Sequence, residues 1–356
     1  MSPRNFAITA VGAILVLVVV ILLLPLIGDG QNDPTASPSP PGTSSPSADV
    51  SVSAEPRREV TLLLGFRPDV QFAAFYYGQQ SGIYAEAGLE VTIEHRSGPD
   101  LIRLVADGQA EFGVADATDV MIARSTIPIT YVASLYERFP VALIGAPEVV
   151  PPNPAGLAGL RIGTPGRFGS SWHALLAMLD AGGLTADDVT IREYQQFNQV
   201  EGLLNGDVDL ITGFRVNEPL QLAARDFETE LLTIDDIAPL PGPGTVVGDE
   251  LLAADPELIS AFVEATARAQ AAVIEDPEAG LAAAEEAVPA IAEGRDTALA
   301  VLEATVELWQ GDDGFGQGAI PLEVWEAGWE TMLRLGLMDG SVPVSEMVST
   351  DFAGTR

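Results

Sequence analysis

The chain has 356 residues and a formal net charge of −34, and all 17 of its basic residues are arginine. So negative a chain repels nucleic-acid backbones and anionic lipid surfaces, which argues against a nucleic-acid partner. Because lysine and cysteine are absent, Schiff-base catalysis, a Walker A phosphate loop, a thiol nucleophile and a lipid anchor on cysteine are excluded. With His95 and His173 as the only imidazoles, we expect no metal site, no cofactor and no catalytic residue.

The amino-terminal region predicts a membrane anchor and a tether. The run 6–27 carries no charge and reaches the roughly 20 residues needed to cross a bilayer. It is longer than the apolar part of a cleaved signal, so an uncleaved single-pass helix is favoured. Arg4, in the tip 1–5, lies before the run and acids follow it, which predicts a cytoplasmic tip and an extracytoplasmic remainder. Residues 28–57, rich in Pro and Ser, predict a disordered linker.

Beyond the linker, periodicity predicts the same alternation of strands and helices twice. The first series has strands at 60–66, 89–95, 111–115 and 127–135 and helices at 71–82, 99–107 and 117–124. The second has strands at 160–164, 189–194, 210–214 and 230–234 and helices at 170–181, 197–205 and 219–225. Two such series favour two α/β lobes with mostly parallel sheets, and one long doubly wound sheet is the alternative.

Two proline-rich segments, 147–154 and 239–244, predict the crossings between the lobes. After the second crossing the chain predicts further helices at 256–275, 277–287, 295–309 and 321–335, the first two begun by an Asp-Pro pair. These helices are expected to pack on the first lobe. The predicted organisation is therefore a first lobe of residues 58–147 and 245–356 and a second lobe of residues 148–244.

The loops after the first, third and fourth strands of each lobe predict the ligand site, because ligands bind at the carboxyl ends of parallel strands. Aromatic, arginine and carboxylate residues are enriched there, which favours stacking and hydrogen bonding of a flat ligand. These loops and the strand ends before them supply six candidate ligand-binding residues: Asp116, Tyr136, Arg167, Trp172, Phe214 and Asn217.

Several residues near these loops have a purely structural alternative. Tyr76 lies at helical spacing from Phe72 and could face the core. Asn217 and Glu218 precede a proline, so either could cap a helix instead of touching a ligand. The arginines of the loops could hold an anion, although ion pairs with nearby acids are the simpler interpretation. Ser170 begins a helix whose free N–H groups suit an electronegative ligand edge.

Several fragments together carry a resemblance to a known family. They are Gly82, Tyr84, Glu86, Gly88 with Leu89 and Val91, Gly108, then GTPGRFGSSW, GFRVNEPLQL and PGPG. Over residues 58–340 the chain resembles the nitrate/sulfonate and thiamine-pyrimidine group of ABC solute-binding proteins, and looks closest to binders of the thiamine pyrimidine precursor and of riboflavin. The resemblance implies the contacts Phe66, Asp69, Gln71, Tyr76, Phe168, Ser170 and Glu218.

The resemblance also implies a type II periplasmic-binding-protein fold, with a ligand cleft between two α/β lobes and a partner permease and ATPase. The enzymatic branch that builds the thiamine pyrimidine uses a cysteine-rich motif and a lysine for pyridoxal phosphate, and both are absent here. We therefore expect a monomeric, membrane-anchored binding protein that captures a pyrimidine or flavin by hinge closure. The alternatives are a sulfonate or nitrate binder, an enzyme of pyrimidine synthesis, and a membrane-anchored sensor.

Overall fold

A computed structural model describes residues 56–96, 100–136, 139–235, 237–310 and 318–352 of the chain. The predicted tip 1–5, the anchor 6–27 and nearly all of the linker 28–57 lie outside these ranges. Within them, no helix has both the length and the apolar character that crossing a bilayer requires.

The first sheet has the strand order β2-β1-β3-β10-β4. Its strands are β1 Arg58–Leu64, β2 Leu89–His95, β3 Phe112–Ala115, β4 Ile129–Ser134 and β10 Gly244–Gly248. β1 runs parallel to β2 and β3, whereas β10 is antiparallel to β3 and β4. Every residue of β3, β4 and β10 is buried, as expected for strands covered on both faces.

The second sheet repeats this arrangement, with the order β7-β6-β8-β5-β9. Its strands are β5 Val141–Gly145, β6 Arg161–Thr164, β7 Thr190–Glu193, β8 Leu210–Phe214 and β9 Glu230–Thr233. β6 is parallel to β7 and β8, and β5 is antiparallel to β8 and β9. The expected α/β fold with two sheets is confirmed, but the sheets are mixed, because β5 and β10 each enter from the other sheet without a covering crossover helix.

The sequence prediction missed β5 and misplaced one crossing. β5 is a short apolar run that periodicity alone does not identify, and its residues fall inside the range 58–147 predicted for the first lobe. Since β4 and β5 belong to different sheets, the chain crosses between the end of β4 at Ser134 and the start of β5 at Val141. The segment 147–154 connects β5 to β6 within the second sheet, so the crossing predicted there is wrong. The return crossing, between β9 and β10, contains residues 239–243 as predicted.

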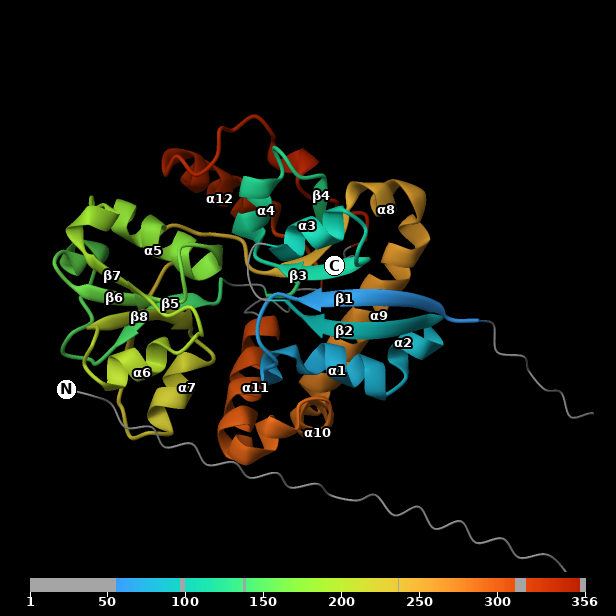
Figure 1. Cartoon of the computed structure of the whole chain (residues 1–356), viewed down its shortest axis with the longest axis horizontal. Helices are drawn as coiled ribbons and strands as arrows, with labels where there is room; N and C mark the ends of the chain where they lie inside the picture. The colour runs from blue at the N-terminus through green and yellow to red at the C-terminus, as the bar shows by residue number, and fades with distance from the viewer. Residues whose placement is uncertain (1–55, 97–99, 137–138, 236, 311–317, 353–356) are drawn as a thin grey trace, which may run out of the picture. The chain divides into compact units, whose positions relative to one another are not determined.

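Helices surround each sheet (Figure 1). Around the first lie α1 Ala73–Gln80, α2 Ile83–Glu86, α3 Asp100–Ala106, α4 Ala117–Ala123, α8 Asp249–Ala254, α9 Pro256–Glu275, α10 Pro277–Ala287 and α11 Arg295–Gln310. Around the second lie α5 Gly169–Ala181, α6 Gln199–Leu204 and α7 Glu218–Ala223, and α12 Leu322–Arg334 packs on α4 and α5. We call the first sheet with its helices the first lobe, and the second sheet with α5–α7 the second lobe.

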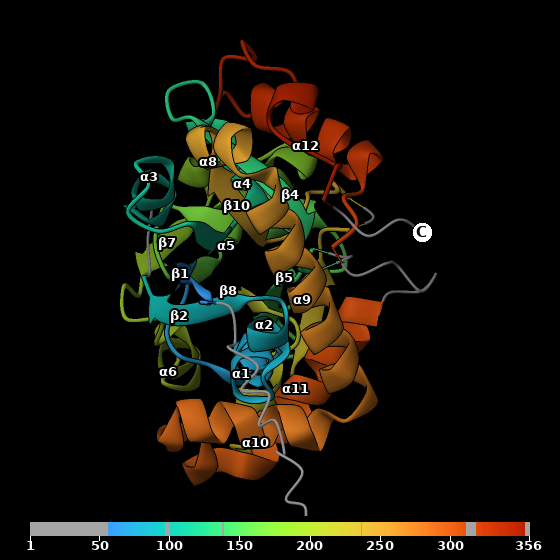
Figure 2. The same cartoon turned by 90° about the vertical axis from the view of Figure 1, so that its right-hand side faces the viewer.

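The carboxyl-terminal helices complete the core of the first lobe. Figure 2 shows α9 running past α2, with α10 beneath α1. The ring of Phe262 in α9 stacks on Phe112 of β3, with centroids 3.9 Å apart, and on Tyr84 of α2 at 5.6 Å. As predicted, Asp255 and Asp276 cap α9 and α10, and each accepts a hydrogen bond from a backbone N–H of the first turn. The helices predicted after the return crossing therefore belong to the core of the first lobe.

Candidate functional site

A cavity lies between the two lobes, at the strand ends where the sequence predicts ligand binding, and we call it the interlobe cavity. The first lobe and the crossings line it with Gly65, Phe66, Gln71, Phe72, Leu101, Ile102, Val114, Ala115, Asp116, Asp119, Leu135, Tyr136 and Pro243. The second lobe lines it with Pro165, Phe168, Gly169, Ser170, Ser171, Phe197, Gln199, Gly213, Phe214, Asn217 and Glu218. Among the described residues of this lining, none carries a basic side chain, and Arg138, two residues after Tyr136 in the sequence, lies outside the described residues.

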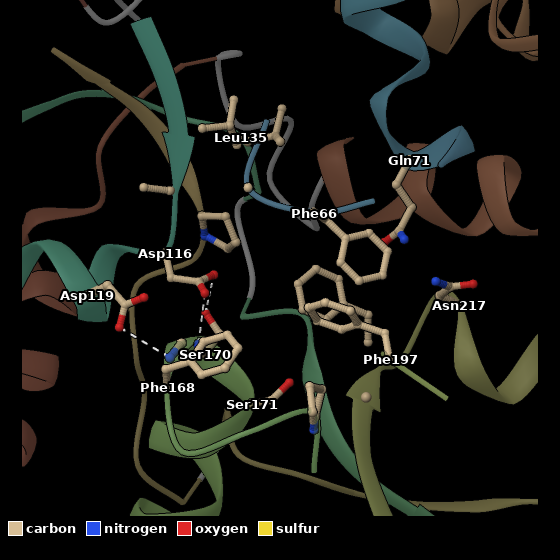
Figure 3. Close-up of a pocket in the computed structure, with 18 of the residues that line it drawn as sticks. Phe66, Gln71, Asp116, Asp119, Leu135, Phe168, Ser170, Ser171, Phe197 and Asn217 are labelled. Atoms are coloured by element: carbon tan, nitrogen blue, oxygen red, sulfur yellow. Dashed lines mark hydrogen bonds between the residues drawn. The ribbon is translucent and has the colours of Figure 1, made fainter. Parts of the chain in front are cut away.

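Aromatic rings from both lobes face one another across the interlobe cavity. Phe66, after β1, and Phe197, before α6, are in edge-to-face contact with ring centroids 4.8 Å apart. Tyr136 and Phe214 form a second edge-to-face pair at 6.2 Å. Figure 3 shows Phe66 and Phe197 next to each other, with the ring of Phe168 standing apart beside Asp116. Such rings offer stacking faces for a flat ligand.

The backbone of Phe197 is in the left-handed region, with φ of 54°. This conformation is unfavourable for a residue with a Cβ atom, and strained residues of this kind cluster at ligand sites. The N–H of Phe197 donates to the carbonyl of Tyr194 at 2.8 Å, which closes a turn between β7 and α6. The turn directs the Phe197 ring toward Phe66.

Two buried glutamines each present an unpaired oxygen. Nε2 of Gln71 donates to Oδ1 of Asp69 at 3.1 Å. Nε2 of Gln199 faces the carbonyl of Thr212 at 3.4 Å and Oε1 of Glu218 at 3.3 Å. These acceptors fix the orientation of both amides, and each Oε1 is left buried without a hydrogen-bond donor among the described residues. An unpaired buried acceptor is costly, so a donor from a bound ligand would stabilise the site.

Glu218 is a buried carboxyl in the wall of the interlobe cavity. Its Oε2 accepts a hydrogen bond from the N–H of Phe214 at 2.7 Å, and burial raises its pKa to about 7. Gly213 makes room for it, since a Cβ there would lie 2.8 Å from the carboxyl. Asn217 precedes α7 without capping it by its side chain, and its Oδ1 accepts from Gln221 at 2.6 Å. The capping alternative therefore does not describe Asn217.

A cluster of hydrogen bonds joins the first lobe to the amino end of α5. Asp116 accepts from the Ser170 N–H at 2.9 Å and from the Ser170 hydroxyl at 2.6 Å. Asp119, one turn further along α4, accepts from the Gly169 N–H at 3.2 Å. Burial raises the pKa of both carboxyls, and the neighbouring Asp116 contributes to raising the pKa of Asp119 to about 7. The helix N–H groups predicted to meet a ligand are thus bonded to these two carboxyls.

Four predicted site residues lie outside the lining. Asp69 caps the short 3-10 helix Val70–Phe72 by accepting from the Gln71 N–H at 3.1 Å. Arg167 pairs with Glu193 at 3.0 Å and covers the ring of Trp172 at 5.1 Å. Arg167 and Trp172 therefore contact each other rather than the interlobe cavity.

Tyr76, the fourth of these residues, is buried and bonded to His95 at 3.0 Å. Nδ1 of His95 lies 3.0 Å from the carbonyl of Phe66 and must donate to it, so Nε2 accepts from the Tyr76 hydroxyl. Burial lowers the pKa of His95, consistent with this neutral form. Tyr76 thus acts on the interlobe cavity through the backbone of Phe66.

The other nine predicted residues do line the interlobe cavity: Phe66, Gln71, Asp116, Tyr136, Phe168, Ser170, Phe214, Asn217 and Glu218. Sequence reasoning missed Asp119, Phe197 and Gln199. Asp119 could have been found from its position one helical turn after Asp116. Phe197 lies in the loop between β7 and α6, whereas nothing local distinguishes Gln199 from a surface glutamine.

Comparison with known proteins gives one family and several relatives. A family model described as "NMT1/THI5 like" matches residues 69–280. The riboflavin-binding protein RibY of Chloroflexus aurantiacus is 30% identical over 97% of both chains. A formylaminopyrimidine-binding protein of Halalkalibacterium halodurans is 25% identical over 75% of this chain and 82% of its own. A 4-amino-5-hydroxymethyl-2-methylpyrimidine phosphate synthase of Aspergillus parasiticus is 26% identical over 62% of this chain and 68% of its own.

Solved structures share the fold. The alkanesulfonate-binding protein SsuA of Xanthomonas axonopodis superposes with a TM-score of 0.64 at 15% identity, covering 82% of this chain and 98% of its own. At this identity the match indicates the fold alone, and it agrees with the predicted two-lobed periplasmic-binding-protein class.

Proposed function

The chain belongs to the NMT1/THI5-like family, and from this membership we propose that it is the extracytoplasmic solute-binding component of an ABC-type importer, with a flavin such as riboflavin as its ligand. A relative named for riboflavin binding aligns with nearly the whole chain, which supports this ligand class. A permease and an ATPase would be the partners, and the apolar run 6–27 would hold the monomeric binding protein at the membrane.

The observation that carries the proposal is the combination of facing aromatic rings and two unpaired buried oxygens in the interlobe cavity. Phe66 and Phe197 meet from opposite lobes, and Phe168 stands apart from them. The oxygens of Gln71 and Gln199 require donors. A flavin has a flat ring system for stacking, an imide N–H on the ring edge and hydroxyls on its side chain. It therefore supplies a ring that can stack on the aromatic side chains and donors for the two unpaired oxygens.

Capture would proceed by closure of the two lobes around the ligand. The chain passes between the sheets between β4 and β5 and again between β9 and β10, and both crossings contribute to the lining through Leu135, Tyr136 and Pro243. Rotation about such paired connections is the usual movement of two-lobed binding proteins. A ring held between residues of both lobes would favour the closed arrangement, because it contacts Phe66 and Phe197 together.

An aminopyrimidine is the second candidate ligand, favoured by the relative named for formylaminopyrimidine binding. An amino group and a ring fit the same acceptors and aromatic faces. A sulfonate or nitrate fits less well, because the described lining residues include no basic side chain and the N–H groups of Gly169 and Ser170 are bonded to carboxyls. An enzyme of pyrimidine synthesis is disfavoured by the absence of lysine and cysteine from the sequence.

Titration of riboflavin into the full-length chain in mild detergent tests the proposal, since flavin fluorescence is quenched when the ring stacks on aromatic side chains. We expect saturable quenching and a rise in the unfolding temperature. At 100 times the dissociation constant a ligand adds about 2.7 kcal/mol to the free energy of unfolding. A response to taurine or nitrate without any response to riboflavin or an aminopyrimidine would contradict it, and product formation from a pyrimidine precursor would support the enzyme instead.

A further inference from the structure

We infer that the carboxyls of Asp116 and Asp119 occupy the hydrogen-bond donors at the amino end of α5, and that they thereby exclude negatively charged ligands from the interlobe cavity. This inference rests on the proposed function, which gives the ligand class as flavins. It narrows that class to flavins that carry no charge where they contact α5. Figure 3 shows both carboxyls pointing toward Ser170 at the start of this helix.

The amino end of α5 is where an anionic ligand would otherwise bind. Gly169, Ser170 and Ser171 begin this 13-residue helix and all three line the interlobe cavity. The first N–H groups of a helix have no intrahelical acceptor and carry the positive end of the helix dipole. Phosphates and sulfonates are attracted to such ends.

In this chain the carboxyls of the first lobe already occupy that position. The N–H groups of Gly169 and Ser170 donate to Asp119 and Asp116 at 3.2 and 2.9 Å. The hydroxyl of Ser170 adds a third bond, to Oδ1 of Asp116 at 2.6 Å. An incoming anion would find these donors used and their positions filled by oxygen atoms.

The helix end is shaped to admit the carboxyls. Gly169 has φ of 69°, and a Cβ at this position would lie 2.7 Å from Oδ2 of Asp116. A side chain there would therefore push the carboxyl away. Since Phe168 supplies no side-chain cap to α5, the caps come from α4 of the other lobe instead.

Among the described residues that line the interlobe cavity, none carries a positive charge beside the two carboxyls. His173 is the nearest imidazole, with Nδ1 2.8 Å from the Thr118 hydroxyl and 3.7 Å from Oδ1 of Asp119. It is buried, which lowers its pKa to about 4 and leaves it neutral at physiological pH. A negatively charged ligand group beside the two carboxyls would thus meet no positive charge among the described lining residues.

The test compares anion binding by the wild-type chain and by Asp116→Ala/Asp119→Ala, both full length in detergent, using calorimetric titration with sodium ethanesulfonate against sodium chloride at equal ionic strength. We expect no specific binding by the wild type and millimolar or tighter binding by the double variant. Asp116→Ser/Asp119→Ser, with side chains too short to reach the helix donors, should bind the sulfonate if the alanine pair does not fold. Asp180→Ala is the matched control, because it removes a carboxylate from the far end of α5, where Asp180 pairs with Arg334.

A parallel titration compares riboflavin with flavin mononucleotide, which carries the same ring and an added phosphate. We expect the wild type to prefer riboflavin by about tenfold or more, and the double variants to lose most of that preference. The inference would be overturned if the wild type bound the sulfonate, or if both double variants folded and neither bound it. Failure of every chain to bind either flavin would instead reject the proposed ligand class, and the sulfonate titration would still decide the role of Asp116 and Asp119.

Discussion

The hydroxyl of Ser170 lies 2.6 Å from Oδ1 of Asp116, although the two residues are 54 positions apart in the sequence and belong to different lobes. The contact joins the start of α5 to the residue that follows β3, at the edge of the interlobe cavity. It links the stability of the two-lobed arrangement to the groups that a ligand meets.

Ser170→Ala should lower the free energy of unfolding by about 1–3 kcal/mol, because it leaves an oxygen of the partly buried Asp116 without its donor. The measurement is urea unfolding of the full-length chain. Ser171→Ala is the control, since Ser171 begins the same helix and, among the described residues, its hydroxyl has no hydrogen-bond partner. Equal losses from the two substitutions would show that the Ser170 hydroxyl does not stabilise the contact.

Asp119→Asn should change how stability depends on pH. Burial raises the pKa of Asp119 from 3.8 to about 7, so in this range the folded chain holds a proton that the unfolded chain releases. The Asp119 contribution to the free energy of unfolding therefore falls as pH rises from about 4 to 7. The variant lacks this fall. From about pH 4 to pH 7 its free energy of unfolding should therefore rise by on the order of 2 kcal/mol relative to that of the wild type.

His173 contributes in the opposite direction, because its pKa is lowered to about 4 and the unfolded chain takes up the proton between that value and 6.5. Both proteins retain His173, so the difference between them at each pH reports Asp119 together with its effect on the neighbouring Asp116. Urea unfolding from pH 4 to pH 8 measures it. Parallel curves for the wild type and the variant would reject the prediction.

Gln71→Leu should weaken riboflavin binding by about tenfold or more, because it removes the buried oxygen that would accept a ligand donor while keeping a side chain of similar size. Fluorescence titration gives the dissociation constant. Gln79→Leu is the matched control, since Gln79 donates to the carbonyl of Val91 and lies outside the lining of the interlobe cavity. Similar losses of affinity in both variants would argue against a ligand bond at Gln71.

Phe197→Gly and Phe197→Ala should both weaken flavin binding, because each removes the ring that meets Phe66. Their stabilities should differ. The glycine variant should be more stable by about 1 kcal/mol, since glycine adopts the positive φ of this position without strain. Phe214 of β8 is the control position. Its φ is not positive, so there the alanine variant should be more stable than the glycine variant. Urea unfolding of the glycine and alanine variants at both positions measures these differences in stability.

Much of the secondary structure was predictable because its signals are local. The alternation of Leu89–His95 predicted β2 with the observed bounds, and the Asp-Pro pairs predicted the starts of α9 and α10. β5 was missed because five apolar residues carry no periodicity, and the strand is defined by its pairing with residues 210–214 and 230–233. The misplaced crossing followed directly from that omission.

The candidate site was predictable in part for the same reason. Loops at strand ends placed Phe66, Asp116 and Glu218 in the lining of the interlobe cavity. Asp69 and Arg167 were predicted from the same loops, yet they cap a short helix and pair with Glu193, respectively. A polar residue next to a cavity either turns toward it or bonds to a neighbour, and side-chain packing decides between the two.

The sequence by itself determined the class of the protein. Its strand and helix periodicities favour two α/β units, and its lack of lysine and cysteine excludes whole groups of catalysts. Only the tertiary structure decided that Asp116 and Asp119 of one lobe occupy the helix end of the other, where the sequence had predicted free N–H groups for a ligand. Local propensity fixes elements over a few residues, whereas the partner of a helix end depends on which distant segment the packed sheets bring against it.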